Sequence, residues 1–467
     1  MVRGSGPLGR NLNELDASGG GVRKLAAMSP TGVDVEAWLR AAPMHDLLPE
    51  RRRDALGRPG SVEPLDLLPL GDGAALAIAR TQEGVLVVPT VEAATSGPRR
   101  AVAGDGAFAA ILRAMREGTA SGAFGGEGFG GPSSAGEGEV AIDVDQSNDS
   151  VIVGGSAVVK VFPLTSPGPQ PGLDLPVHLA SVGFTALPAP LGALRWTSPE
   201  GEDVVLATAA TLLPGARDGW EWYLERLLGW LDGAAADATA FDPAPALGVV
   251  AARMHAALET PSDVLPRPSG AADRATAERW RRAATAVADE ALAATHGEEG
   301  SRLAAREGAI RAELEPLGDA AGTVTTRVHG DFHVGQILEW SGGYAVADFD
   351  GNPVAPPDER GAFDTPVRDV AAFVRSIDHV GRIASRRRSG RDEAVESWIA
   401  RSRTAFLEAY RGELEAAGAG RLFDERLLRP LEVVQECHEY VYAARFLPRW
   451  RYVPDLAMRA MFPMEDR

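Results

Sequence analysis

The stretch VHGDFHVGQILEWSGGYAVADFDGNPV, residues 328–354, decides the fold because it contains two β-strand patterns around a tight turn. ILEW and YAVADF are mainly apolar and aromatic, and the Ser-Gly-Gly between them is typical of a hairpin turn. A hairpin brings together the segments that flank its two strands. HGDFHVGQ and DFDG are therefore expected to lie close in space.

Four oxygen-bearing side chains fall in these flanking segments. They are Asp331, Gln336, Asp348 and Asp350. Carboxylate and amide oxygens are hard donors, which suit Mg²⁺ rather than zinc or copper. Asp331 precedes the hairpin on a loop and is free to face an acceptor group, whereas Asp348 is expected at the end of a strand that fixes its direction.

Simpler interpretations of the same segment remain open. Asp331 and Asp348 can cap turns, while His329 and His333 satisfy buried backbone groups. A zinc-type site on the two histidines is disfavoured because the glycine between them breaks a helix and no cysteine is nearby. A magnesium site of this composition usually serves phosphoryl transfer, in which a separate carboxylate orients the acceptor hydroxyl.

A second hairpin pattern places a lysine inside an apolar strand. VIVGGSAVVKVF, residues 151–162, has two β-branched runs joined by Gly-Gly-Ser, and Lys160 falls in the second run. The chain has only two lysines, Lys24 and Lys160, because arginine supplies nearly all of its 47 basic residues. The alternative is that Lys160 has no function and remains by chance in a chain that uses arginine almost everywhere.

The chain changes from strand-rich to helix-rich near residues 204–215, where VVLATAATLLPG suggests a hinge. By composition it divides into a disordered tail at 1–31, a small α+β unit at 32–104, a strand-rich part at 105–210 and a helix-rich part at 211–467. Residues 118–138 are rich in Gly and Ser and are expected to form a long loop.

Composition limits the partners. With 467 residues, 45% hydrophobic and 24% charged, the chain is expected to be folded, and its net charge of −18 argues against nucleic acid as a partner. One cysteine, Cys437, excludes an intrachain disulfide, and no apolar run is long enough to span a membrane. We expect a cytoplasmic protein, with a monomer favoured, whose start codon is either Met1 or Met28.

Taken together, the strand lysine, HGDFHVGQ and DFDGNP resemble the kinase-like phosphotransferases typified by aminoglycoside phosphotransferases, whose loop usually reads HGDxHxxN. Gln336 replaces the usual Asn. The continuations DFDGNPVAPPDER and VRDVAAFVRSIDHVGR are similar to the actinobacterial maltokinase branch of that group. The resemblance covers residues 146–454 and implies a bilobal, protein-kinase-like α+β fold with an added amino-terminal cap.

The resemblance also implies roles for individual residues. Asp331 is expected to be the catalytic base, and the magnesium ligands are expected to be Gln336, Asp348 and Asp350. For ATP, the resemblance implies Lys160 on the α- and β-phosphates with Asp174 as its acidic partner, the backbone of Thr211, Leu212 and Leu213 on adenine, and Asp218 on the ribose. The segment QSNDS, 146–150, resembles the turn that covers the phosphates.

The segment QECHEYVYAARFLPRWRYVP, 435–454, bears on the acceptor. An apolar helical stripe formed by Val433, Cys437, Val441 and Ala444 predicts that Glu436 and Glu439 project elsewhere, about 60° apart. Trp450 and Tyr440 offer flat faces for a sugar ring, and adjacent carboxylates suit an ammonium group. Alternatively, the two glutamates form a solvated face paired with Arg445 or Arg449.

This segment resembles the glucosamine kinases of the maltokinase-like branch. The resemblance implies ATP- and Mg²⁺-dependent phosphorylation of D-glucosamine to glucosamine 6-phosphate, with Asp331, Glu436, Glu439 and Trp450 touching the sugar. Two alternatives use the same fold, a maltokinase that forms maltose 1-phosphate and an aminoglycoside phosphotransferase. A third is a non-catalytic, pseudokinase-like binding module, which the complete set of lysine, base and metal ligands disfavours.

Overall fold

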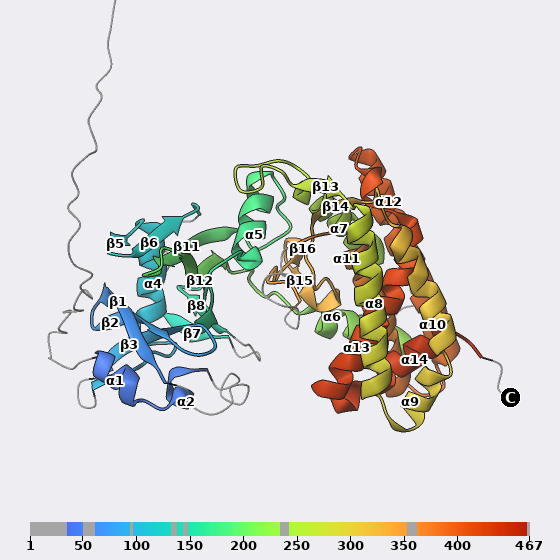
Figure 1. Ribbon diagram of the computed structural model, residues 1–467, viewed down its shortest axis with the longest axis horizontal. Coiled ribbons are helices and arrows are strands. Elements are labelled where there is room, and N and C mark those ends of the chain that lie inside the picture. Colours follow the sequence, from blue (N-terminus) through green and yellow to red (C-terminus); the bar gives the residue numbers. More distant parts are fainter. Residues whose placement is uncertain are drawn as a thin grey trace, which may run out of the picture.

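Two lobes of different secondary structure form the protein in a computed structural model that describes residues 35–49, 61–93, 97–131, 138–142, 148–233, 242–352 and 362–464. Figure 1 shows a strand-rich lobe at one end and a helical lobe at the other, with the hairpin β15–β16 between them. This is the bilobal α+β arrangement expected from the sequence. The predicted tail at 1–31 lies outside the described residues.

Two antiparallel sheets form the first lobe. In the first sheet the strand order is β1-β2-β3-β10, with β4 beside β3, and in the second it is β5-β6-β11-β12-β9-β8-β7. The strands are β1 (Glu63–Gly71), β2 (Ala74–Arg80), β3 (Val85–Ala93), β4 (Gly97–Arg100), β5 (Ala120–Ser121), β6 (Phe124–Gly128), β7 (Glu139–Ala141), β8 (Asp149–Val153), β9 (Ala157–Val161), β10 (Leu164–Thr165), β11 (Pro190–Thr197) and β12 (Asp203–Thr211). The helices of this lobe are α1 (Val35–Ala41), α2 (Met44–Leu47), α4 (Ala107–Arg116) and α5 (Pro171–Ser181).

One hydrophobic core joins both sheets through α4. Leu68 and Ile78 from the first sheet, Ile111 from α4, and Leu194 and Leu206 from the second sheet are all buried in the same cluster. Strand β10, which follows β9 in the chain, completes the first sheet by pairing with β3. The boundary expected near residue 104 therefore does not divide two separate cores.

The glycine-rich stretch 118–138 is not the continuous loop expected from its composition. Residues Phe124–Gly128 form β6, which pairs antiparallel with β11. Gly126 lies so close to α4 that an added Cβ would approach the carbonyl oxygen of Ala114 to 2.2 Å. Glycine in this part allows a strand to pack closely on a helix. Composition alone does not distinguish this role from that of a flexible loop.

The second lobe is mainly helical. Its helices are α6 (Gly219–Leu231), α7 (Ala244–Leu258), α8 (Arg274–Ala294), α9 (Gly297–Ala304), α10 (Glu307–Leu314), α11 (Val367–Arg387), α12 (Asp392–Ala416), α13 (Leu428–Arg445) and α14 (Tyr452–Met461), with short 3₁₀ turns η2 (Glu315–Asp319), η3 (Val334–Gln336), η4 (Gly420–Leu422), η5 (Glu425–Leu427) and η6 (Pro448–Trp450). Its strands are β13 (Ser269–Ala271), β14 (Val324–Arg327), β15 (Ile337–Trp340), β16 (Gly343–Val346) and β17 (Phe363–Asp364). Helices α6, α11 and α13 share one buried core. None of the helices in the described ranges is long and apolar enough to cross a bilayer.

Both predicted hairpins are present. Strands β8 and β9 pair with Val153 opposite Ala157, so Gly154, Gly155 and Ser156 form the turn and Lys160 lies in β9. Strands β15 and β16 pair with Trp340 opposite Gly343. Strand β16 ends at Val346, so Asp348 is not at the end of a strand as expected, and it has a left-handed backbone with φ 61°.

Candidate active site

The loop before β15 is held by a buried carboxylate on α11. Asp369 accepts hydrogen bonds from the backbone N–H of His329 at 2.7 Å and of Gly330 at 3.0 Å. The ring of His329 is hydrogen-bonded through Nε2 to the carbonyl oxygen of Ala347 at 2.9 Å, which ties this loop to the chain after β16. HGDFHVGQ and DFDG are thus brought together as the hairpin pattern predicts.

Asp331 lies at the open side of this loop. Burial raises the pKa of its carboxyl group to about 6, against smaller lowering effects from His329 and Gln336. Nε2 of His333 is 3.8 Å from its Oδ2. Burial lowers the pKa of His333 to about 4, so this neighbour is uncharged at neutral pH, when Asp331 is mostly ionised. A carboxylate with these properties can accept a proton.

Lys160 reaches from β9 across to the residues that follow β16. Its ammonium pairs with Asp350, and Nζ is 3.5 Å from Oδ1 of Asp348. Although burial favours the neutral amine, the two carboxylates raise the pKa of Lys160, so it is a cation. The lysine of the first lobe and the acids of the second therefore face one site.

The acidic partner expected for Lys160 is not Asp174. Asp174 lies in the first turn of α5, where Oδ2 accepts from the backbone N–H of Gln170 at 3.4 Å. Burial raises the pKa of its carboxyl group. The ion pairs of Lys160 within the described parts of the chain are made with Asp348 and Asp350. Asp174 is a short side chain on a helix that begins with proline, and the sequence could not show which way it points.

The residues present fit a magnesium ion. Asp348 and Asp350 both approach one ammonium group, so two hard-oxygen donors already converge on a single cation. Gln336, at the end of η3, supplies an amide oxygen from the loop that carries Asp331. Over the residues that the structure describes, His, Cys, Asp and Glu form no group of three arranged for a metal. The ligand set predicted from the sequence contains only two such residues and remains a prediction.

The first turn of α5 closely approaches Asp350. A Cβ added to Gly172 would lie 1.7 Å from Oδ1 and 2.9 Å from Cγ of Asp350. A helix amino terminus also stabilises a nearby negative charge. Glycine at 172 therefore leaves room for the carboxylate at the position where Lys160 and Asp348 meet it.

We expect Gly172→Ala to move the Asp350 carboxylate and to raise the Mg²⁺ concentration needed for half-maximal activity, by roughly fivefold for a shift worth about 1 kcal/mol. A magnesium titration at saturating ATP measures this. Gly125→Ala, on β6, is the matched control for glycine loss in the same lobe, since a Cβ there meets no atom within 4 Å. An unchanged titration for Gly172→Ala would remove Asp350 from the ligand set.

The proposed nucleotide segment follows β12. The backbone N–H of Thr211 bonds to the carbonyl of Ala189, and that of Leu212 bonds to the carbonyl of Ser156. Leu213 is then the residue of this segment left to supply a backbone donor to adenine. Asp218 caps α6 through a 2.7 Å hydrogen bond from the N–H of Trp220, and burial raises the pKa of its carboxyl group. Of QSNDS, residues 146 and 147 lie outside the described residues.

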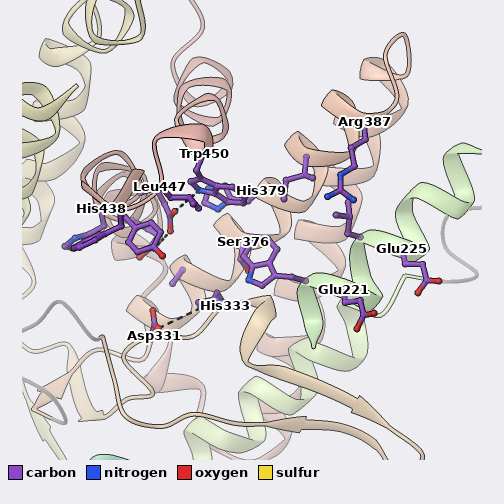
Figure 2. A pocket seen from close by; sticks show the side chains of 18 of the residues that line it. Glu221, Glu225, Asp331, His333, Ser376, His379, Arg387, His438, Leu447 and Trp450 are labelled. Carbon is purple, nitrogen blue, oxygen red and sulfur yellow. Dashed lines mark hydrogen bonds and ion pairs between the residues drawn. The ribbon is translucent and has the colours of Figure 1, made fainter. Parts of the chain in front are cut away.

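A cavity of about 1170 Å³ opens beside Asp331. Figure 2 shows Asp331, His333, Ser376, His379 and Trp450 around it, with Glu221, Glu225 and Arg387 farther along. Its walls come from α6, α11, α13 and η6. Among the described residues, those that line this cavity all belong to the second lobe.

Glu439 lines this cavity as predicted, but Glu436 does not. Oε1 of Glu439 accepts from Nε2 of Gln435 at 3.1 Å, and its Oε2 accepts from Nε1 of Trp450 at 3.3 Å. Trp450 also lines the cavity and meets Trp220 edge-on, with ring centroids 5.9 Å apart. A carboxylate and an indole thus stand together in reach of a small polar ligand.

Glu436 is fully buried, contrary to the expectation that its side chain points away from the apolar face of the helix. Its Oε1 accepts from Nε of Arg375 at 2.6 Å and from Nε2 of His379 at 2.8 Å. Burial lowers the pKa of His379, but the Glu436 carboxylate outweighs it and raises the pKa above 6.5. Because His379 lines the cavity, Glu436 acts on the pocket through this side chain.

Several cavity residues were missed by sequence reasoning. These are Trp220, Ser376, His379, Gln435 and His438. Gln435 lies four residues before Glu439, so a helical wheel centred on Glu439 would have included it, whereas His438 is one residue away and about 100° around the helix. Ser376 and His379 lie on α11. No motif in the sequence of that helix indicates that it faces the cavity lined by Glu439.

Comparison with known proteins agrees with this architecture. Residues 140–407 match the phosphotransferase enzyme family. The chain is 42% identical to a glucosamine kinase of Streptacidiphilus jiangxiensis, with 88% of this chain and 94% of that protein aligned. It is 37% identical to a glucosamine kinase of Mycolicibacterium smegmatis, with 85% of this chain and 98% of that protein aligned.

Solved structures give the same similarity. A glucosamine kinase in complex with glucosamine, ADP and inorganic phosphate superimposes with a TM-score of 0.78 and 38% identity, covering 92% of this chain and all of that one. Another crystal form of a glucosamine kinase gives a TM-score of 0.81 over the same shares. The similarity includes the amino-terminal cap, which the family match at residues 140–407 does not reach.

Proposed function

Because this chain belongs to the phosphotransferase enzyme family, we propose that it transfers the γ-phosphoryl group of ATP to D-glucosamine, giving glucosamine 6-phosphate and ADP. The observation that carries the acceptor assignment is the Glu439 carboxylate beside Trp450, in the same cavity as Asp331. The glucosamine kinase relatives support the same substrate. Maltose carries no amine for this carboxylate.

Asp331 is assigned as the base. It accepts the proton of the sugar 6-hydroxyl as that oxygen forms a bond to the γ-phosphorus, and the bond between the γ-phosphorus and the β,γ-bridging oxygen breaks to release ADP. Its raised pKa, about 6, keeps it mostly ionised at pH 7 and basic enough to take the proton. Because His333 is neutral, it does not weaken Asp331 as a base by pairing with it as a cation.

Lys160 is assigned to the ATP phosphates, since it is the cation that the first lobe directs toward the acids after β16. Gln336, Asp348 and Asp350 would hold Mg²⁺, which neutralises phosphate charge when bound. The backbone of Thr211–Leu213 and the Asp218 side chain are assigned to adenosine. Asp174 has no direct contact with Lys160 and is assigned no phosphate role.

Glu439 and Trp450 are assigned to the sugar. The protonated amine of glucosamine pairs with the carboxylate, and the apolar face of the pyranose packs on the indole. Glu436 is removed from the set of direct contacts because it is fully buried behind His379. Its contribution is to hold the His379 ring in place.

We expect Glu439→Gln to lower kcat/KM for glucosamine by about thirtyfold, as loss of a charge-assisted contact worth ~2 kcal/mol implies. Glucose has no ammonium group, so its kcat/KM should change far less. Coupled measurement of ADP release against each sugar gives both values. Glu408→Gln, at an exposed position on α12 outside the cavity, is the matched control. Equal losses for the two sugars would contradict the amine contact.

The function itself is tested by ADP release with glucosamine, glucose, maltose and an aminoglycoside as separate acceptors. Glucosamine is expected to give the highest kcat/KM, with phosphate on its 6-hydroxyl by ³¹P–¹H correlation. A clear preference for maltose or for the aminoglycoside would replace the assignment by one of the alternatives of the same fold. Absence of turnover with all four would favour a binding module.

We also propose a cytoplasmic location and an active monomer. The cytoplasm supplies ATP, the phosphoryl donor of the proposed reaction. Gel filtration combined with activity measurement across the eluted peak tests the monomer.

A further inference from the structure

Helix α5 packs on both lobes, although it lies between two strands of the first lobe in the sequence (Figure 1). Leu175 and Leu179 are buried in the hydrophobic core of the second lobe. Leu173 is buried in a separate cluster with Ala193 of β11 and Val205 of β12. Apolar contacts on two faces therefore hold this helix between the lobes.

A buried histidine fixes the end of α5 to the second lobe. His178 is fully buried, and its Nε2 lies 3.0 Å from the carbonyl oxygen of Ala257 on α7. Its Nδ1 lies 2.8 Å from Oγ of Ser262, which follows α7 in the chain. A carbonyl oxygen can only accept, so the ring donates from Nε2 and accepts the Ser262 hydroxyl proton at Nδ1. The position of α5 is thus set by the second lobe as well as by the first.

The first turn of α5 lies against the carboxylate of Asp350. Oδ1 of Asp350 is so close to Gly172 that it occupies the space of a side chain at that position. Oδ2 of the same carboxylate pairs with the ammonium of Lys160. The Asp350 carboxylate therefore stands between α5 and the lysine. The helix fixes the carboxylate, and the carboxylate fixes the ammonium.

The other contacts of the ammonium make Asp350 its main partner. Nζ of Lys160 is 3.5 Å from Oδ1 of Asp348, whose side chain is 53% exposed against 35% for Asp350. Nζ also lies 5.5 Å from the centre of the Phe162 ring. Asp174, the acid of α5, accepts instead from the backbone of its own helix start. Within the described parts of the chain, the second lobe supplies both acidic partners of Lys160.

We propose that Asp350 is a positioning residue for Lys160: it holds the ammonium where it meets the ATP phosphates, the role that the family resemblance gave to an acid on α5. This inference rests on the proposed function and adds to the magnesium role proposed for Asp350. An ammonium group has three N–H donors, so it can keep Asp350 and still donate to phosphate oxygens. The phosphoryl-transfer step is unchanged.

A double-mutant cycle tests whether Asp350 acts through Lys160. We expect kcat/KM for ATP to fall about thirtyfold in Asp350→Asn and about 10²-fold in Lys160→Met. The double variant should lose at least about fivefold less than the product of the two losses, because the second change removes a partner that is already lost. A combined loss within about fivefold of the product would overturn the proposal.

Gln336→Ala supplies the matched cycle. Gln336 is a proposed magnesium ligand whose amide lies 3.5 Å from the His333 ring, and it makes no ion pair with Lys160. Its loss and that of Lys160→Met should therefore multiply to within about twofold. Equal coupling in the two cycles would mean that the bound metal and nucleotide carry the effect, and the positioning role would be wrong.

The two substrates distinguish positioning from a general loss of structure. In Asp350→Asn, KM for ATP should rise at least about fivefold, whereas KM for glucosamine should stay within about twofold. Neither Asp350 nor Lys160 lines the cavity beside Asp331, so the sugar contacts are untouched. A variant that is only partly folded would lose kcat and keep both KM values. That result for Asp350→Asn would contradict the proposal.

The ion pair is also measured without metal, nucleotide or sugar. In EDTA, Asp350→Asn should lower the Tm of the native protein by about 1–2 °C and should leave that of Lys160→Met unchanged or raise it. An equal fall in both backgrounds would overturn the pairing. If glucosamine is phosphorylated but the Lys160–Asp350 changes are additive in activity and in Tm, only the positioning role is lost. If glucosamine is not phosphorylated, the proposed function fails, whether or not the pair is coupled in EDTA.

Discussion

Asp331→Asn is expected to lower kcat by roughly 10³-fold while ATP affinity changes little, because the base is lost and the nucleotide contacts are elsewhere. In the native enzyme, log kcat/KM for the sugar should fall with decreasing pH below about 6, the pKa of Asp331 in the free protein. The variant should lack this acid limb. Single-turnover measurements between pH 5 and 8, from about one unit below that value to about two units above it, report the chemical step.

Stability distinguishes loss of the base from loss of the fold. The pKa of Asp331 is raised in the folded protein, so its charge at pH 7 opposes folding, and Asn removes that charge. The Tm of Asp331→Asn should therefore equal or exceed that of the native protein. Residual turnover within about tenfold of native would contradict the role of Asp331, since a positioned base contributes at least ~10².

Glu436→Gln is expected to destabilise the protein by about 3–5 kcal/mol, the loss typical when one partner of a buried ion pair is removed. His379 is then left without the carboxylate that it contacts at 2.8 Å, and Arg375 loses a contact of 2.6 Å but keeps its ion pair with Asp378 at 2.9 Å. Urea denaturation at pH 6 measures the free energy of unfolding. Glu413→Gln removes a partner of the more exposed Arg253 and should cost less than about 1 kcal/mol.

The difference between native and Glu436→Gln should depend on pH. Despite burial, Arg375 and His379 lower the pKa of Glu436, so its stabilisation is present above the ordinary value of 4.5 and is lost as pH falls through the lowered pKa. The raised pKa of His379 gives stabilisation that is fully present below the ordinary 6.5 and is lost as pH rises through the raised pKa. The difference should thus be largest between pH 4.5 and 6.5. A loss no larger than that of Glu413→Gln would contradict the buried network.

Local patterns predicted the elements around the site. Gly-Gly-Ser and Ser-Gly-Gly between β-branched or aromatic runs set both hairpins, and the hairpin at β15–β16 brought HGDFHVGQ beside DFDG as expected. The residues that favour a tight turn are adjacent in the sequence, so a hairpin can be predicted from the sequence directly. The family, the fold and the glucosamine kinase similarity expected from the motifs are confirmed by the comparisons.

Side-chain direction on the carboxy-terminal helix could not be predicted in the same way. The stripe of Val433, Cys437 and Val441 suggested one buried face, but α13 contacts α8, α10, α11 and α14, which surround it. A helix packed on several sides buries polar residues too, provided that a partner meets them. For Glu436 those partners are Arg375 and His379 on α11, sixty-one and fifty-seven residues away in sequence.

The same limit applies to the partner of Lys160. Asp174 was chosen by its place in the chain. In the structure Lys160 contacts Asp348 and Asp350, which follow Lys160 by 188 and 190 residues. Such contacts depend on how the lobes are oriented, which no local pattern encodes. The ligand and nucleotide assignments therefore stay predictions until the variants above are measured.

The core that Leu68 and Ile78 share with α4 bears on how this enzyme can be shortened. A truncation that begins at α4 would remove Leu68 and Ile78, which pack on one side of that helix. It would also remove β3, the strand with which β10 pairs. A shortened version of the enzyme should therefore keep the amino-terminal sheet. That sheet packs on α4 in the same hydrophobic core as the sheet that contains Lys160.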